Sequence, residues 1–461
     1  MLKVTAHSEN LDYDWDLLQL QRRFPSRYPV LFESSATQEH IGRFDWLLVS
    51  NGETYSLGND GILRDGAGIV QDERDFFELL NRLYAELPDL EIPADLPAFA
   101  GGYGIYLSYE LAQQVEPILR LPTMHSALPV AHAVRAPWVL VRDRLEKTCK
   151  LVGDASFDDL RQQVHADIAS MLVESAPPAE LPEVMSLTES DGSLFTENVR
   201  KVIDYLAAGD VFQVNLSRGW TAEFAEAVEP SALFERLREH NPAPFAGVFR
   251  MHSGAVVSAS PERLVSVHDG VVQTRPIAGT RARVAGADDE AVKRELIEHT
   301  KERAEHVMLI DLERNDVGRI AKPGTVEVNE LMVIESYKHV HHIVSNVRGT
   351  LNDHVLPGDV LQATFPGGTI TGCPKVRCMQ IVAELEQEGR GAYTGAMGWL
   401  GKSGGMQLDT NILIRSASVE TNIVRFRAGA GIVIDSQPDA ELAETRAKAR
   451  GMLHALGAFG S

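Results

Sequence analysis

The first feature that points to chemistry is a run of glutamates in a predicted helix. The segment DEAVKRELIEHTKERAEHVMLIDLERNDVGR, residues 289–319, is predicted to form one long helix followed by a turn. Its residues Glu298, Glu302 and Glu305 are spaced i, i+4 and i+7, so they share one face. Because stacked like charges destabilise a helix, this acidic face suggests a function that requires the carboxylates. Taken alone, the pattern is also typical of a solvated acidic surface.

A second acidic helix is predicted near the C-terminal end, in DAELAETRAKARGML, residues 439–453. Glu441, Glu444 and Lys448 share one of its faces at i, i+3 and i+7. Mg2+ is a hard ion that takes carboxylate oxygens, keeps several waters and accepts substrate oxygens into its shell. One carboxylate from each helix can therefore hold Mg2+ against a substrate carboxylate. The two helices together predict a magnesium site, although spacing alone leaves the solvated surface open.

A helix and a strand that can position such a site precede these segments. Thr196 is the predicted cap of a helix with one apolar stripe, and Gly209 is its predicted end. The next segment, VFQVNLS at residues 211–217, alternates with period two and predicts a strand with Gln213 on its polar face. Strand and helix signals then mix without a regular βαβ rhythm. This favours an α+β fold over a doubly wound one.

Composition limits the partners of the chain. The 44 basic and 65 acidic residues give a formal net charge of −21, while the hydrophobic share of 44% and the charged share of 24% are ordinary. Such a chain repels nucleic acid backbones and anionic membranes, so neither is an expected partner. An anionic substrate must be met by a few placed cations.

The length of 461 residues predicts two or three domains. The segment SAPPAELPEVMSLTES, residues 175–190, has the composition of a linker, so we place a boundary between regions 1–190 and 191–461. Three cysteines give no disulfide framework. The first residues have no apolar core typical of a signal peptide, and no apolar run reaches the ~20 residues that span a bilayer. A cytoplasmic protein is expected.

The sequence contains seven motifs whose order is informative. They are SASPERLV, PIAGTRAR, EHVMLIDLERNDVGR, HHIVSNVRG, FPGGTITGCPKVRCM, GAYTGAMGWL and RAGAGIVIDSQPDAELAETRAKA. Together, over residues 190–461, they resemble the chorismate-binding domain shared by anthranilate, aminodeoxychorismate, isochorismate and salicylate synthases. The resemblance implies a large mixed α+β sandwich of the anthranilate synthase large-subunit type. In that fold, orthogonally packed antiparallel sheets are flanked by helices.

The resemblance also implies how metal and substrate are held. Glu305 and Glu444 match the Mg2+ ligands, and Glu302 matches a carboxylate that supports them. Chorismate carries two carboxylates, which an acidic chain can bind only through Mg2+ and placed basic residues. The positions matched to groups that hold these carboxylates are Tyr393, Arg415, Lys448, Gly429 and Gly431.

The implied catalytic positions surround the ring of the substrate. Glu262 matches the acid near the departing C4 hydroxyl, and His342 and Thr369 match residues of the pocket. Hydroxide is a poor leaving group, so a protonated carboxyl must supply a proton. Glu262 therefore needs a pKa raised by burial or by acidic neighbours. Without the resemblance, His342 would be interpreted as a core histidine with its hydrogen bonds satisfied.

Gln213 bears on the nucleophile. Members of this family that add water carry a lysine at its position as general base, and glutamine cannot deprotonate water. The chain therefore resembles the aminating branch. Ala278 in PIAGT matches anthranilate synthases, which aminate C2 and release pyruvate, whereas many C4-aminating enzymes have lysine there.

The N-terminal region favours amination at C4. RYPVLFESSA, GGYGIYLSYELAQQVEP and LPVAHAVRAPWVLVRD resemble aminodeoxychorismate synthases more closely, as does TGCPKVRCM in place of SGAPK. The expected product is 4-amino-4-deoxychorismate, which feeds 4-aminobenzoate and folate synthesis. Anthranilate formation is the alternative enzyme. A catalytically silent binding or regulatory homologue is an alternative of another class, and the intact site residues weigh against it.

Two further expectations concern a partner and regulation. The chain has no glutaminase signature, since no cysteine lies in a GxCxG-type elbow with a following His and Glu. Ammonia is therefore expected from a separate glutamine amidotransferase subunit. LFESSA resembles the segment that lines the tryptophan pocket of anthranilate synthases, where Glu33 and Ser34 would be the contacts. An ordinary strand end is the other interpretation of that segment.

Overall fold

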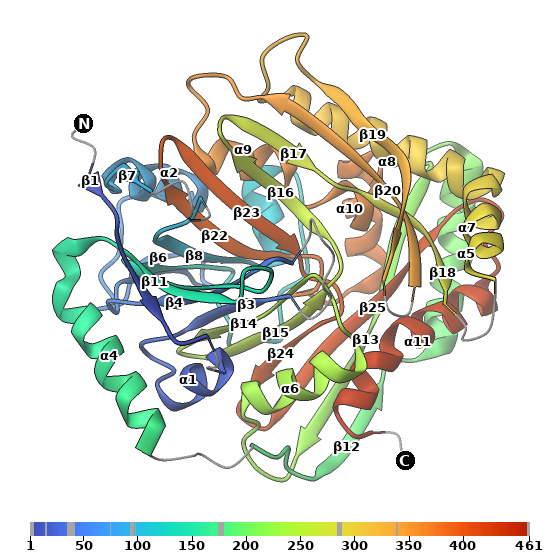
Figure 1. The fold of residues 1–461 in the computed structure, drawn as a ribbon. Coiled ribbons are helices and arrows are strands. Elements are labelled where there is room, and N and C mark those ends of the chain that lie inside the picture. The colour runs from blue at the N-terminus through green and yellow to red at the C-terminus, as the bar shows by residue number, and fades with distance from the viewer. Residues whose placement is uncertain are drawn as a thin grey trace.

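The computed structural model describes residues 4–13, 16–34, 42–73, 75–92, 96, 98–173, 179–283, 288–337 and 340–458. Two large antiparallel sheets form its centre and helices cover them (Figure 1). The described strands of the first sheet lie in the order β12 (Val184–Glu189), β13 (Gln213–Phe224), β25 (Ile423–Ile432), β24 (Ser416–Glu420), β15 (Gly254–Ser260), β14 (Phe245–Met251), β3 (Val30–Glu33), β4 (Phe44–Val49), β10 (Trp138–Asp143), β11 (Thr148–Gly153) and β2 (His7–Leu11), with β21 (Gly372–Cys373) paired to β13.

The second sheet is built in the same antiparallel manner. Its described strands lie in the order β18 (Ile277–Ala282), β20 (Val340–Thr350), β17 (Val271–Thr274), β16 (Arg263–His268), β23 (Met406–Ile412), β22 (Ala396–Lys402), β8 (Gly102–Leu107), β9 (Ala131–Ala136), β5 (Thr54–Leu57) and β6 (Leu63–Asp65), with β19 (Glu327–Ser336) paired to β20. A short parallel pair, β1 (Val4–Thr5) and β7 (Leu90–Glu91), lies apart from both. The predicted mixed α+β class with large antiparallel sheets is confirmed.

Helices gather on two sides of the sheets. In Figure 1, α5, α7, α8, α10 and α11 lie on the right, around β13, β20 and β25, whereas α1 and α4 lie on the left. The helices are α1 (Leu17–Arg23), α2 (Phe76–Glu86), α3 (Ala112–Val115), α4 (Asp158–Val173), α5 (Gly192–Ala208), α6 (Pro230–His240), α7 (Asp289–Glu298), α8 (Thr300–Gly318), α9 (Pro357–Thr364), α10 (Lys375–Glu386) and α11 (Pro438–Ala455), with 3-10 turns η1 (Tyr109–Leu111), η2 (Ala155–Phe157) and η3 (Gly368–Ile370).

The glutamate-rich segment differs from its prediction. It forms two helices, because His299 is extended and its side chain accepts a hydrogen bond from the Glu302 amide as the cap of α8. Glu298 therefore ends α7, and only Glu302 and Glu305 share a face of α8. The prediction of one long helix was wrong. A histidine cap carries no glycine or proline signal that the sequence pattern could reveal.

The helix before β13 begins earlier than predicted. Asp191 caps α5 by accepting from the Ser193 amide, and Thr196 lies inside the helix with its hydroxyl bonded to the Ser193 carbonyl. Gly209 ends the helix in the left-handed conformation, with φ of 82°, as predicted. The predicted strand also forms, as the start of β13.

One apolar cluster orients the strands that carry the predicted site. Val214 and Leu216 of β13 and Ala430 and Ile432 of β25 pack against α5 and α10. Each buried Val, Leu or Ile side chain of this kind contributes about 1.5–3 kcal/mol. Since side chains alternate along a strand, Gln213, Gly429 and Gly431 must face the opposite side, toward α8 and α11.

Both sheets contain strands from either side of residue 190. In the first sheet β3 lies between β14 and β4, and in the second β8 pairs with β22. The predicted boundary near residue 190 therefore does not divide one sheet from the other. As a domain boundary it stays a prediction.

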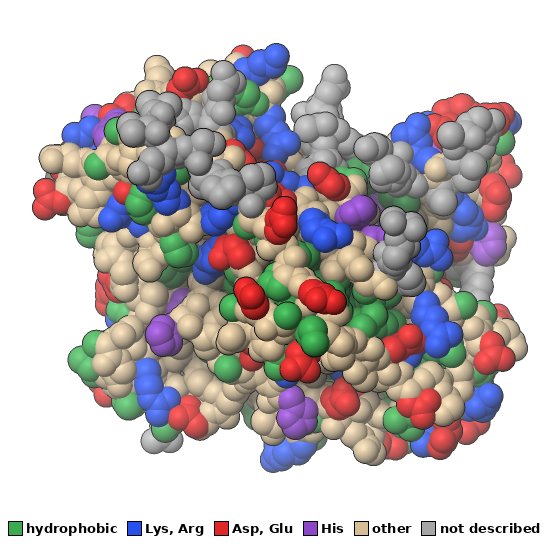
Figure 2. All heavy atoms as spheres, turned by 90° about the horizontal axis from the view of Figure 1, so that it is seen from below, with side chains coloured by type: hydrophobic (Ala, Val, Ile, Leu, Met, Phe, Trp, Pro, Cys, Tyr) green, Lys and Arg blue, Asp and Glu red, His purple; other side chains and the backbone are tan. Residues whose placement is uncertain are grey.

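One face of the molecule mixes basic and acidic side chains (Figure 2). Seen from below, Lys and Arg side chains are scattered among Asp and Glu, around a small apolar area (Figure 2). No helix within the described ranges is long and apolar enough to cross a membrane.

Candidate active site

The first part of the site is a contact between β13 and α8. The Gln213 amide nitrogen donates to Glu305 Oε1 at 2.7 Å, and the Gln213 side chain is buried. Gly431 lies on the neighbouring strand β25, where a Cβ would be 2.3 Å from Gln213 Nε2 and 3.7 Å from Glu305 Oε1. A side chain there would collide with the pair, so the glycine is a steric requirement of this contact.

Two further carboxylates, Glu302 and Glu444, and one lysine surround this contact. Burial raises the pKa of Glu305. The Gln213 hydrogen bond and the charge of Lys448 oppose this shift, whereas the nearby carboxylates of Glu302 and Glu444 add to it. Lys448 Nζ lies 2.7 Å from Glu444 Oε1 and 3.1 Å from the Gly429 carbonyl oxygen. The carboxylates of α8 and α11 are therefore close enough for their charges to interact.

These residues fit a divalent cation. Glu302 Oε1 accepts from Arg281 at 2.5 Å, but its buried Oε2 has no hydrogen-bond partner in the described part of the chain. Among the same residues no three His, Cys, Asp or Glu side chains converge into a closed cage. An ion held here would complete its shell with water and substrate oxygens, which is how Mg2+ usually binds to proteins.

The second part of the site offers groups for an anion. Tyr393 Oη would lie 2.6 Å from a Cβ on Gly429, so the phenol is in contact with the glycine backbone. Arg415 is half-buried, and its guanidinium donates to Asn241 Oδ1 at 3.3 Å. Burial lowers the pKa of Arg415, and no carboxylate of the described residues forms an ion pair with it. A carboxylate ligand would supply the missing charge.

The third part is a buried acid in the turn between β15 and β16. Glu262 is 5% exposed, and burial raises its pKa to about 8. The Ile277 amide donates to Glu262 Oε1 at 3.4 Å. This hydrogen bond and the Thr369 side chain oppose the rise in pKa, while the charge of Glu313 on α8 adds to it. The carboxyl is therefore protonated at neutral pH, which is the state that donates a proton.

His342 on β20 is held as a neutral ring. Its Nδ1 lies 2.8 Å from Thr280 Oγ1, and the ring packs edge-on against Tyr337 with centroids 5.6 Å apart. Burial, followed by the charge of Arg415, lowers the pKa of His342 to about 4. The ring is thus oriented near the anion-binding groups and carries no charge of its own.

Strand β18 connects these parts. Its Ile277 amide reaches Glu262, the backbone of Gly279 lies against Glu302 Oε2, and its Thr280 hydroxyl reaches His342. Ala278, 6% exposed, lies between these contacts. The residue that distinguishes PIAGT from PIKGT therefore lies within the site.

Most of the chain is similar to known proteins. Residues 30–454 match the family described as chorismate binding enzyme. The chain belongs to the chorismate-binding enzyme family. The match begins far ahead of residue 190, so it extends beyond the seven motifs.

Relatives of this chorismate-binding enzyme carry two different names. It is 40% identical to aminodeoxychorismate synthase component 1 of Bacillus subtilis, over 87% of this chain and 86% of that protein. It is also 40% identical to anthranilate synthase component 1 of Cereibacter sphaeroides, over 82% of this chain and 78% of that one. The crystal structure of anthranilate synthase component I from Streptococcus pneumoniae superposes with a TM-score of 0.79 at 31% identity, covering 90% of this chain and 93% of the other.

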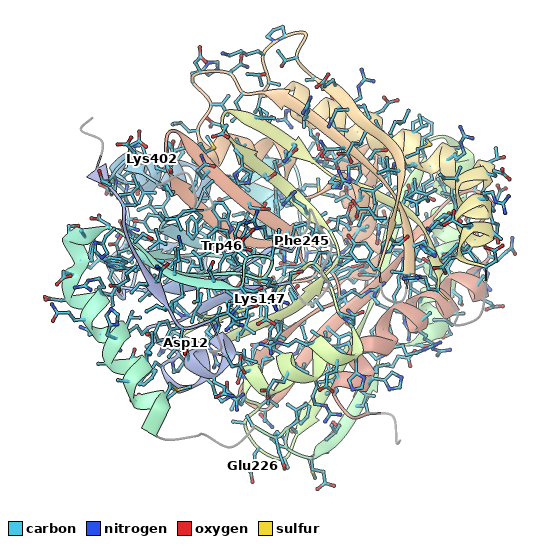
Figure 3. The ribbon with its side chains drawn as sticks, in the orientation of Figure 1. Asp12, Trp46, Lys147, Glu226, Phe245 and Lys402 are labelled. Carbon is cyan, nitrogen blue, oxygen red and sulfur yellow. The ribbon has the colours of Figure 1, made fainter. Side chains whose placement is uncertain are left out.

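A separate cavity of about 510 Å3 contains the predicted regulatory residues of this chorismate-binding enzyme. Glu33 and Ser34 line it together with Trp46 and Phe245, which are labelled near the middle of Figure 3. Burial raises the pKa of Glu33 to about 7, and Arg238 opposes the shift with a 2.7 Å hydrogen bond. The two residues thus lie in a cavity, and a regulatory ligand for it stays a prediction.

One residue of the site was missed from the sequence. Glu313 follows Leu309 and Ile310 by four and three residues and precedes Val317 by four, so it lies on the buried stripe of α8. A glutamate on an apolar stripe signals a buried carboxyl, and that pattern was available in the sequence.

Proposed function

We propose that the chain aminates chorismate at C4, giving 4-amino-4-deoxychorismate, with Mg2+ bound by Glu305 and Glu444. The observation that carries amination is Gln213, a residue that cannot act as a base, in direct contact with Glu305. A water nucleophile would need a base there, whereas ammonia needs none. Support for C4 comes from the similarity to the Bacillus subtilis protein over 87% of this chain.

In the proposed reaction the chain binds a dianion and supplies one proton. Arg415 and Tyr393 hold one carboxylate, and Lys448 and the backbone at Gly429 hold the other beside the cation site. A Mg2+ ion bound there supplies neutralising charge for that carboxylate. The C–O bond at C4 breaks with its electron pair on oxygen, and Glu262 donates the proton that makes water. The C–N bond forms from the lone pair of ammonia, and the proton then lost from nitrogen can return to the Glu262 carboxylate.

The second candidate is amination at C2 with loss of pyruvate, giving anthranilate. The observation that favours it is Ala278, buried inside the site where many C4-aminating enzymes have lysine. One assay separates both candidates from a silent homologue. The chain is incubated with chorismate, Mg2+ and an ammonium salt. Anthranilate fluoresces directly, aminodeoxychorismate becomes visible as 4-aminobenzoate only after a lyase is added, and a silent homologue gives neither.

Ammonia is proposed to come from a separate glutamine amidotransferase. The relatives from Bacillus subtilis and Cereibacter sphaeroides are each named as component 1 of a synthase, which supports a second component here. The purified chain is expected to turn over chorismate with ammonium salts but not with glutamine. Efficient turnover with glutamine by this chain alone would refute the need for a partner.

The cavity around Glu33 and Ser34 is proposed to bind tryptophan as a regulator. Its size of about 510 Å3 is within the range of small-molecule sites, and Trp46 and Phe245 provide aromatic walls. Titration calorimetry with tryptophan tests this, and absence of heat at millimolar ligand would rule out a useful site.

A further inference from the structure

A buried arginine contacts the ring of Tyr393. Arg390 is 4% exposed, and its guanidinium lies over two aromatic rings, 4.8 Å from the centroid of Tyr109 and 5.6 Å from that of Tyr393. Tyr109 belongs to η1, in the region before residue 190. A guanidinium over an aromatic face is attracted by the ring electrons, most strongly where water is excluded. Arg390 therefore connects the N-terminal region to a residue of the site.

The guanidinium of Arg390 is fully engaged inside the protein. Its Nε and Nη2 donate to the two carboxylate oxygens of Glu386 at 3.0 Å and 2.7 Å, and the side chains of this pair are at most 2% exposed. Nη2 also donates to the Asn215 carbonyl oxygen of β13 at 2.7 Å. Glu386 is held in turn by Arg427 of β25 at 3.0 Å and by the Ser217 amide at 2.7 Å. Arg390 therefore acts on the site through its position and not by binding a ligand.

The backbone around Arg390 is fixed from η1. Glu110 accepts from the Arg390 amide at 2.7 Å and from the Gly391 amide at 3.1 Å. The Tyr109 amide donates to the Gly391 carbonyl oxygen at 2.9 Å. The Tyr393 amide donates to the Arg390 carbonyl oxygen at 3.1 Å, which closes a turn between these two residues. Both the backbone and the guanidinium of Arg390 are therefore in contact with η1.

The Tyr393 hydroxyl is sensitive to the placement of its ring. Its Oη would lie 2.6 Å from a Cβ on Gly429, so the phenol is close to the strand where a carboxylate is proposed to bind. A displacement of about 1 Å is enough to remove much of the contribution of a positioned group. The contact with Arg390 is thus able to decide how well Tyr393 meets a ligand.

We propose that Arg390 is a positioning residue, which Tyr109 and Glu110 hold against Tyr393 so that the Tyr393 hydroxyl meets a carboxylate of the substrate. In this way the region before residue 190 sets the affinity of the site without contacting the ligand. The role of Tyr393 toward the substrate rests on the proposed function. The placement of its ring does not, because it can be measured in the resting protein.

The first experiment follows the ring of Tyr393 by fluorine NMR in the full chain, labelled with fluorotyrosine and without substrate. The signal lost in Tyr393→Phe identifies Tyr393, and Tyr28 of another apolar cluster is the internal reference. Tyr109→Leu removes one of the two rings under Arg390, so the Tyr393 signal is expected to move or to split. Tyr109→Phe is the matched control. It keeps the ring, and the hydroxyl that it removes has no hydrogen-bond partner among the described residues.

Arg390→Lys is a second, independent variant. Lysine keeps the charge that pairs with Glu386 but lacks the flat guanidinium that lies over both rings. The Tyr393 signal is expected to move here as well. Thermal unfolding followed by circular dichroism shows whether each variant is folded. An unmoved Tyr393 signal in either folded variant, or an equal change in Tyr109→Phe, would overturn the proposal.

The second experiment measures chorismate binding by titration calorimetry with Mg2+, and steady-state kinetics after ammonium is added. In Tyr109→Leu and Arg390→Lys, Kd and KM for chorismate are expected to rise about three- to tenfold, while kcat stays within about twofold. A merely structural defect would instead lower kcat at unchanged KM, and that result would contradict the proposal. If wild type binds no chorismate, the proposed function fails, while a moved Tyr393 signal still supports the positioning.

A double variant separates positioning from general damage. In Tyr393→Phe the hydroxyl is already lost, so adding Tyr109→Leu is expected to raise KM for chorismate little further. Damage unrelated to Tyr393 would multiply the two losses, and a multiplied loss would overturn the proposal.

Discussion

The two ends of the site use the same residue type in opposite ways. At the cation end, Glu444 and Lys448 of α11 are 47% and 38% exposed, and they form an ion pair that solvent reaches. At the acid end, Glu262 and Glu313 are almost fully buried. Water and a counter-ion favour the charged form of a carboxyl, and an apolar surrounding favours the neutral form. Burial thus distinguishes Glu444, which is suited to bind a cation, from Glu262, which is suited to donate a proton; Glu305, whose pKa burial also raises, is intermediate between them.

The largest effect is expected at the cation end. Glu305→Ala or Glu444→Ala should lower Mg2+-dependent turnover roughly a hundredfold or more, because the charge stabilisation supplied by the ion is lost. Turnover is measured over a Mg2+ titration, with folding checked by thermal unfolding. Glu298→Ala is the matched control, since the break at His299 puts Glu298 at the end of α7, away from this face. Wild-type rates in the first two variants would be incompatible with the metal assignment.

The acid end should respond in kcat rather than in binding. Glu262→Gln keeps the shape of the side chain and removes its proton, so kcat should fall by about 10²–10⁴-fold with KM nearly unchanged. Steady-state kinetics with chorismate and saturating ammonium measure both constants. A loss confined to KM would show that Glu262 only binds substrate, and the contrast between the two ends would disappear.

The free energy of unfolding should depend on pH because Glu262 is buried. The folded pKa of Glu262, about 8, is above the ordinary value of 4.5, so the folded protein holds this proton more tightly than the unfolded chain does. The favourable contribution is present below pH 4.5 and decreases as pH rises toward 8, by roughly a few kcal/mol. Glu262→Gln should lack this loss, so denaturant unfolding should show it gaining on wild type between pH 5 and 8. Parallel curves for the two proteins would mean that Glu262 is not buried as described.

The smallest effect is expected from crowding the contact between β13 and α8. Gly431→Ala places a methyl group 2.3 Å from Gln213 Nε2, and overpacking of this kind costs about 1–3 kcal/mol. Turnover should fall about tenfold and the Mg2+ requirement should rise. Gly219→Ala is the control on the paired strand, where the nearest atom is the flexible end of Arg427 at 3.6 Å. Equal effects of both substitutions would mean that the close approach at Gly431 has no special role.

The sequence predicted those parts of the site that local periodicity determines. The alternation in residues 211–217 placed Gln213 opposite the apolar face. The helical spacing placed Glu444 and Lys448 on one face, where the structure shows them as an ion pair. Resemblance, not periodicity, identified Glu262, because nothing near it in the sequence reveals burial. The charge of Glu313, 51 positions further along the chain, also acts on Glu262, and only the fold brings these residues near one another.

Helix ends were predicted less well than helix faces. The cap of α5 is Asp191 and not Thr196, although both residue types favour that position. The break at His299 depends on packing of α7 and α8 against β18 and β20, which no local pattern records. Several neighbouring residues can cap the same helix, and tertiary contacts decide which of them does so.

The interleaving of strands has a consequence for how the chain can be divided. β3 is hydrogen-bonded on both sides, to β14 across more than 200 residues of sequence and to β4 nearby. A break near residue 190 would leave each fragment with bare strand edges, and such edges template aggregation. Tags and fusion partners therefore belong at the two ends of the polypeptide, which Figure 1 shows at opposite sides of the molecule. The proline-rich segment at residues 175–190 has the composition of a linker, but it is not a suitable place to divide the chain.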